Sequence, residues 1–135
     1  MDWTRFALTV LATGFIASLT DWLFMGDLLY KRFNKHPEIW RHSGGSQGEA
    51  RAIAWSAPLP FVTCAVFAAL CEWLHLHSLS GTIILALGIW LVAALPWNIT
   101  MALFIKLQPA IAASYSLGWL VKLSVAAFGV GLILH

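Results

Sequence analysis

The chain has 135 residues, of which 60% are hydrophobic and only 10% are charged. Soluble domains carry about 25% charged residues, so this composition excludes an ordinary water-soluble globular domain. The mean hydropathy of +0.79 points the same way.

Four apolar stretches are each long enough to cross a bilayer, which takes about 20 residues. They cover residues 6–29, 52–74, 81–104 and 109–134. We therefore predict an all-α fold, a single membrane domain over residues 1–135 built as an up-down bundle of four transmembrane helices. The first stretch lacks the basic start and the small-residue cleavage site of a signal peptide, so we expect it to be a span.

Basic residues predict the orientation, because cytoplasmic loops carry an excess of lysine and arginine. Lys106 and the segment 31–51 lie on one side of the membrane, and only Arg5 lies on the other. The segment contributes Lys31, Arg32, Lys35, Arg41 and Arg51. The sequence thus places 31–51 in the cytoplasm and both termini outside. Next to a transmembrane helix, we expect this segment to contact anionic lipid headgroups rather than nucleic acid.

The most informative residue is Lys122, near the middle of the fourth stretch. An ammonium group at the bilayer centre costs roughly 2.5–3.5 kcal/mol on insertion scales, so it needs a partner or a function. Asp21, in the first stretch, is the best partner. In antiparallel spans the depths of the two residues differ by roughly 6 Å, which a lysine side chain can bridge. Both belong to stripes of small residues, which mark close helix contacts in lipid.

Two interpretations of the Asp21–Lys122 pair remain open. In the first, an ion pair or a neutral hydrogen bond fixes how the first and fourth helices dock. In the second, the pair is a proton or ligand site at the midplane, since ionisable residues within the membrane are often functional. A dry contact would favour the structural interpretation, and an oligomer with a polar cavity would favour transport.

The third stretch contains a second candidate site, formed by Pro96, Asn98 and Thr100. A proline inside a helix frees a carbonyl group and usually produces a kink. Asn98 and Thr100 can satisfy the loosened backbone, or they can face a cavity. We expect a structural kink with local hydrogen bonds, and a binding site at the kink is the alternative.

Glu72, His75 and His77 form a weak candidate metal site on the outward side. Carboxylate and imidazole groups bind zinc or copper, although two histidines at a helix end usually just lie among the headgroups. We expect no cofactor, because no histidine lies inside a span to ligate haem. Cys64 and Cys71 are seven residues apart on one predicted helix, about 10 Å, too far for a disulfide bond.

Several motifs, loose and largely apolar, resemble those of a bacterial family of small four-helix integral membrane proteins of unknown function. They are Asp21–Tyr30 with Trp40, then Gly88, Trp90-Leu91, Pro96, Asn98 and Leu103-Phe104, then Tyr115, Gly118–Val121 and Gly129–Leu134. The resemblance implies a four-helix fold in the bacterial inner membrane and no established activity. Lys122 has no counterpart in these motifs. Small multidrug transporters match less well, because their essential acid in the first helix is a glutamate.

Three hypotheses about function follow. The protein is a structural or interaction bundle, either a homo-oligomer or an accessory subunit of a partner membrane protein. Alternatively, it is a small transporter or proton-coupled carrier that uses Asp21 and Lys122. A weaker alternative is a metal-dependent membrane enzyme on the outward face. No motif of a known enzyme class occurs, so the sequence favours a protein without catalytic activity.

Overall fold

The computed structural model describes residues 2–24, 46–105 and 108–134, and these residues form helices joined by short turns. Most of the basic segment 31–51, together with Lys106, lies outside the described residues. The helices are α1 (Trp3–Asp21), α3 (Gln47–Ser56), α4 (Leu59–Trp73), α5 (Leu79–Ile89), α6 (Leu95–Phe104) and α7 (Pro109–Gly129). Two π-helical turns, η3 (Trp90–Ala94) and η4 (Val130–Leu134), follow α5 and α7.

The all-α prediction is confirmed. Within the described residues, four helical segments are long and apolar enough to cross a membrane. They are Trp3–Phe24, Gln47–Trp73, Leu79–Phe104 and Pro109–Leu134. The first begins three residues earlier than predicted, because Asp2 caps it by accepting a hydrogen bond from the Thr4 backbone N–H at 3.0 Å. Such helices support an integral membrane protein.

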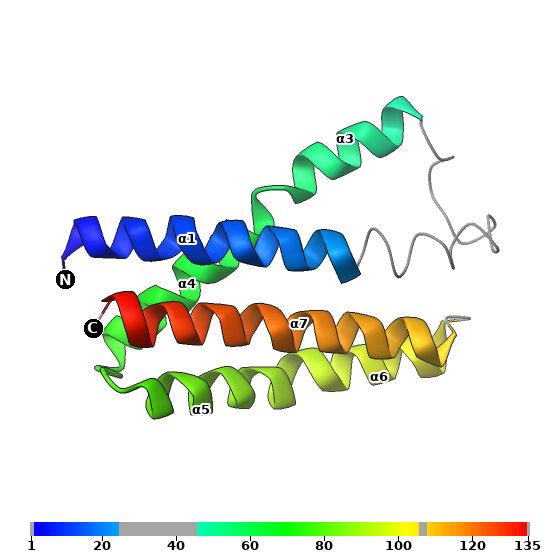
Figure 1. Ribbon diagram of the computed structural model, residues 1–135. Coiled ribbons are helices and arrows are strands. Elements are labelled where there is room, and N and C mark those ends of the chain that lie inside the picture. The colour runs from blue at the N-terminus through cyan, green and yellow to red at the C-terminus, as the bar shows by residue number, and fades with distance from the viewer. Residues whose placement is uncertain (1, 25–45, 106–107, 135) are drawn as a thin grey trace.

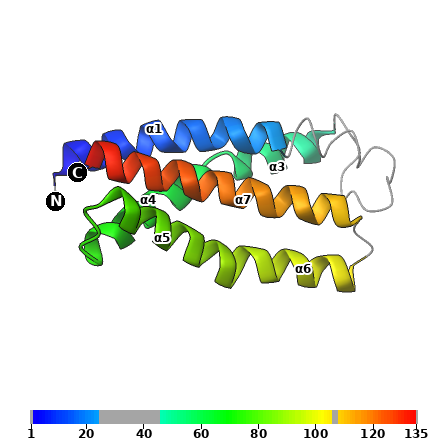
Figure 2. The ribbon, with the colours of Figure 1, turned by 60° about the horizontal axis from the view of Figure 1, so that its bottom comes forward.

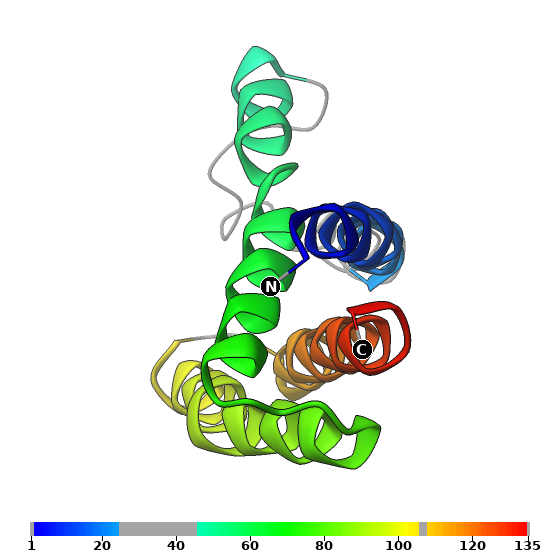
Figure 3. The ribbon, with the colours of Figure 1, turned by 90° about the vertical axis from the view of Figure 1, so that its left-hand side faces the viewer.

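Helix α7 is the centre of the bundle. It packs against α1, α4, α5 and α6. The end-on view in Figure 3 places α1 on one side of α7 and the bent α5–α6 segment on another, with α4 beside them. Figures 1 and 2 show both termini and the α4–α5 turn at the same end, as an up-down arrangement requires.

The second span, predicted over 52–74, begins at Gln47. It breaks at Ala57 and Pro58, between α3 and α4. Proline has no backbone N–H, so Pro58 and Pro60 leave two carbonyl groups of the preceding turn without their helical donors. Beyond this break α3 diverges from the bundle (Figures 1 and 3), and none of its residues is buried.

Close packing of α1 against its neighbours depends on two glycines. A methyl group added at Gly14 would overlap the Phe61 ring of α4, and one at Gly129 would overlap the Thr13 methyl group. A residue with a Cβ at either position would therefore displace the side chain that packs against it. Small residues of this kind are the usual contact between helices in lipid.

Candidate functional site

The structure brings together the two ionisable residues that the sequence paired. Lys122 Nζ of α7 lies 2.6 Å from Asp21 Oδ2 at the end of α1. The lysine side chain is 9% exposed and the aspartate side chain 27%. This distance is that of a charge-assisted hydrogen bond between an ammonium and a carboxylate group. The lysine is therefore enclosed by protein, while the carboxylate keeps one open side.

An aromatic ring completes the surroundings of the ammonium group. Lys122 Nζ lies 4.5 Å from the centroid of the Trp119 ring, one helical turn earlier on α7. The negative face of an indole ring attracts a cation, and the attraction strengthens where water is excluded. Helices α1 and α7 pack against each other, and both also pack against α4. The pair thus lies in the contact between α1 and α7.

Small residues on both helices make this contact possible. Ala17, one turn before Asp21, and Ala126, one turn after Lys122, are both buried. Gly118, one turn before Lys122, faces Phe24, whose Cβ lies 3.6 Å from the position of an added methyl group. The stripe predicted for the fourth helix is buried around Lys122 at Gly118 and Ala126. The stripe predicted for the first helix does not follow the α1–α7 contact, because Ala7 is exposed and Gly14 meets Phe61 of α4.

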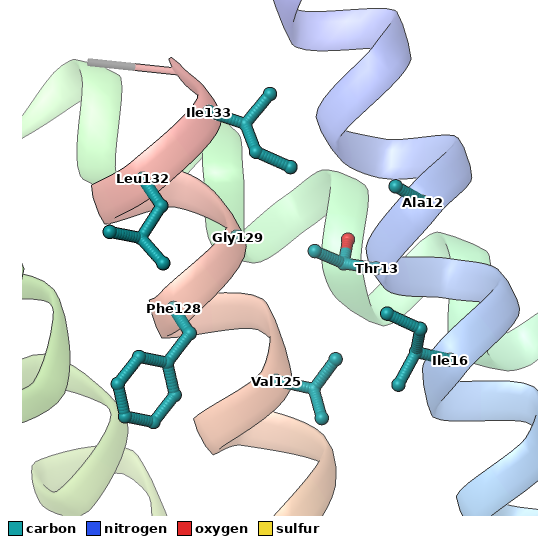
Figure 4. A pocket seen from close by; sticks show the side chains of 8 residues that line it. All are labelled: Ala12, Thr13, Ile16, Val125, Phe128, Gly129, Leu132 and Ile133. Atoms are coloured by element: carbon teal, nitrogen blue, oxygen red, sulfur yellow. The ribbon is translucent and has the colours of Figure 1, made fainter.

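A groove of about 280 Å³ runs beside the α1–α7 contact, nearer the end that holds the termini. Figure 4 shows the side chains around it, and nearly all of them are apolar. The lining residues are Ala12, Thr13, Ile16, Val125, Phe128, Gly129, Leu132 and Ile133. The one polar side chain, Thr13, donates its hydroxyl hydrogen to the Thr9 carbonyl oxygen at 2.7 Å. The groove includes neither Asp21 nor Lys122.

Pro96, Asn98 and Thr100 do not converge on one cavity. Asn98 is buried and donates from Nδ2 to the Ala94 carbonyl oxygen at 2.7 Å, whereas Pro96 and Thr100 are exposed. The helix widens into the π turn η3 directly before Pro96, and the Leu95 N–H bonds to the Trp90 carbonyl oxygen. A wider turn accommodates the proline ring, so the local geometry is that of a kink with its own hydrogen bonds.

The contact between this kink and α7 was not visible in the sequence. The Trp90 indole N–H donates to the Ser116 carbonyl oxygen at 2.9 Å. The Ser116 hydroxyl is buried, and within the described structure it has no hydrogen-bond partner. The sequence offered no signal for this Trp90–Ser116 contact. The contact between Trp119 and Lys122 could have been expected, because the two residues are three apart on one helix.

The structure does not gather Glu72, His75 and His77 into a three-ligand metal site. Across residues 2–24, 46–105 and 108–134, no cluster of three or more His, Cys, Asp or Glu side chains could hold a metal ion. His75 and His77 are exposed on the α4–α5 turn, with ring centroids 6.1 Å apart. Cys64 and Cys71 are buried free thiols.

Comparison with known proteins finds no matching family model, no matching curated protein and no matching solved structure. The resemblance to a bacterial four-helix family therefore stays a prediction.

Proposed function

We propose that this protein is a structural or interaction bundle of the bacterial inner membrane, in which the Asp21–Lys122 ion pair locks α1 onto α7. The observation that carries the proposal is the 2.6 Å contact around a lysine side chain that is only 9% exposed. An uncompensated charge at this depth would oppose insertion. The Asp21 carboxylate and the Lys122 ammonium group compensate each other's charge, and their contact stabilises the docking of α1 on α7.

The surroundings of the pair support docking rather than conduction. In a carrier, the ionisable group exchanges its proton or ligand with water on each side of the membrane in turn, so it needs a polar opening. Here the groove between α1 and α7 is apolar and offset from the pair. Trp119 covers the ammonium group from within the same helix. These contacts hold Lys122 in one position.

An interaction role also fits the shape of the second span. Helix α3 leaves the bundle and buries none of its residues, and it carries exposed Ile53 and Trp55. We propose that the protein assembles with itself or with a partner membrane subunit. The segment 31–51 then lies at the cytoplasmic surface on anionic headgroups, with both termini outside.

A double-mutant cycle tests the docking role. Asp21→Asn or Lys122→Met alone leaves one buried charge without its partner, and breaking a buried pair from one side costs about 3–5 kcal/mol. Because Asp21 keeps an exposed side, we expect Asp21→Asn at the upper end and Lys122→Met below it. The double variant should recover most of the loss, since removing both charges can be nearly neutral. Additive losses in reversible unfolding from detergent micelles would show that the pair does not lock the helices.

Transport remains a second candidate because the Asp21 side chain is 27% exposed. A carboxylate that reaches water could exchange its proton with one side of the membrane. Proteoliposomes containing a pH-sensitive dye distinguish the two roles. The docking proposal predicts equal proton flux for the wild type and for the stable double variant, at the level of empty vesicles. Flux that the double variant abolishes would favour the carrier.

A further inference from the structure

We propose that the groove beside the α1–α7 contact binds one phospholipid, with an acyl chain in the groove and the phosphate at Arg5. The groove has a volume of about 280 Å³, and nearly all the side chains around it are apolar (Figure 4). Ala12 and Ile16 border it on α1, and Phe128 and Leu132 border it on α7. Ile16, Phe128 and Leu132 are exposed, so the groove opens on a face of the bundle that meets lipid.

The position of the groove along α1 matches the depth of one leaflet. Ala12 and Ile16 follow Arg5 by seven and eleven residues. At 1.5 Å per residue they lie about 10 Å and about 16 Å farther along the helix, and half of the hydrocarbon core is about 15 Å thick. Trp3, exposed at the start of the same helix, marks the headgroup level, because tryptophan is enriched at the membrane interface. An acyl chain that enters the bilayer beside Arg5 therefore ends near Ile16.

Arg5 lies above the groove on the same face of α1. Seven residues make almost two helical turns, so Arg5 and Ala12 share one face. Side chains of a helix lean toward its N-terminus, which directs the guanidinium group of Arg5 toward the headgroups. Thr9 and Thr13, on the adjacent face, are buried against Gly129 of α7. The face of Arg5 and Ala12 therefore runs along the edge of the helix contact and is open to a lipid.

Arg5 also supplies the charge that a phosphate group needs. Among the described residues it is the one lysine or arginine at the end of the bundle that holds the termini, and its side chain is 60% exposed. Its Nε lies 3.7 Å from Asp2 Oδ2. This separation exceeds that of a hydrogen bond, so Asp2 leaves the guanidinium N–H groups to phosphate oxygens. A guanidinium above an apolar groove one leaflet deep is complementary to a phosphate above an acyl chain.

Native mass spectrometry of the full-length protein in detergent tests the site with two probes. They are dioleoyl phosphatidylethanolamine and dioleoylglycerol, which has the same chains but no phosphate. We expect the wild type to bind one phospholipid about two- to fivefold more tightly than the diacylglycerol, as an exposed ion pair provides. Arg5→Gln should remove this preference. Ala12→Leu puts a larger side chain into the groove and should weaken the binding of both probes. Ala69→Leu, at an exposed alanine of α4, is the matched control and should bind like the wild type.

Three outcomes would overturn the proposal. The first is equal affinity of the wild type for both probes, or a preference that survives in Arg5→Gln, since the phosphate would then not contact Arg5. The second is an equal effect of Ala12→Leu and Ala69→Leu, which would show that the acyl chain does not occupy the groove. The third is displacement of the phospholipid by excess inorganic phosphate, which would indicate an anion site without an acyl chain. Thermal melting of each variant beforehand shows that a loss of binding is not a loss of fold. The site includes neither Asp21 nor Lys122, so its test is independent of the docking role proposed above.

Discussion

The contact between Gly129 and Thr13 sets how closely α7 approaches α1, and Gly129→Ala tests it. The added methyl group would overlap Thr13 Cγ2, while every other neighbour stays at ordinary contact distance. Thr13 cannot turn away freely, because its hydroxyl donates to the Thr9 carbonyl oxygen at 2.7 Å. Overpacking costs about 1–3 kcal/mol, and a strained hydrogen bond adds about 1 kcal/mol. The better helix propensity of alanine returns about 1 kcal/mol, so we expect a net loss of about 1–3 kcal/mol.

Reversible unfolding of the protein in mixed detergent micelles measures this loss, and two further variants make the result specific. Thr13→Ser removes the methyl group and keeps the hydroxyl, so in the Gly129→Ala background it should restore at least about 1 kcal/mol. Gly118→Ala is the matched control on the same helix, because its added methyl group would lie 3.6 Å from Phe24 Cβ. We expect it to be neutral or slightly stabilising. Equal stability of the two alanine variants, with no coupling to Thr13→Ser, would refute the packing argument.

One further comparison asks which buried hydroxyl groups contribute to stability, and another tests the orientation of the protein in the membrane. Ser116→Ala removes a buried hydroxyl that has no partner in the described structure, so stability in the same unfolding assay should stay or rise by about 1 kcal/mol. Thr82→Val deletes the hydroxyl that bonds the Ala127 carbonyl oxygen of α7 at 3.1 Å and should cost about 1 kcal/mol; the reverse order would contradict both assignments. An impermeant maleimide added to intact cells should label Ser78→Cys and spare Ser46→Cys, since Cys64 and Cys71 are buried. Labelling of Ser46→Cys from outside would contradict the proposed orientation and indicate the opposite one.

Composition and depth were sufficient to predict the four helices and to identify the partner of Lys122. A stretch of about 20 apolar residues has few alternatives to a spanning helix, because lipid offers no partners for free backbone groups. Few ionisable residues lie within the spans, so Lys122 had one candidate at a similar depth. The small number of candidates is why Asp21 could be predicted as the partner, and the structure places the two side chains 2.6 Å apart.

Other features depend on tertiary contacts that the sequence does not encode locally. Pro58 and Pro60 indicate a break, but they do not indicate the direction of α3, which leaves the bundle and buries none of its residues. The left-handed backbone of His75 is similar, because glycine is the local signal for that conformation. It becomes favourable here through the packing of Leu76 on the core. Patterns of single residues therefore located the turn without predicting its geometry.

The usual contrast between apolar core and polar surface is weak in lipid, which is as apolar as leucine, so residue size is the better guide to burial. In the most apolar 18-residue stretch of each segment, 44% of the residues are buried in the fourth and only 11% in the third. The third exposes large side chains such as Trp97, Leu103 and Phe104, whereas the fourth buries Gly118, Ala126 and Ala127. Lys122 belongs to the second group. A charge flanked by glycine and alanine on a helix that packs against four others faces protein. The position of Lys122 among small residues is thus itself an argument that its charge is paired, independent of where Asp21 lies.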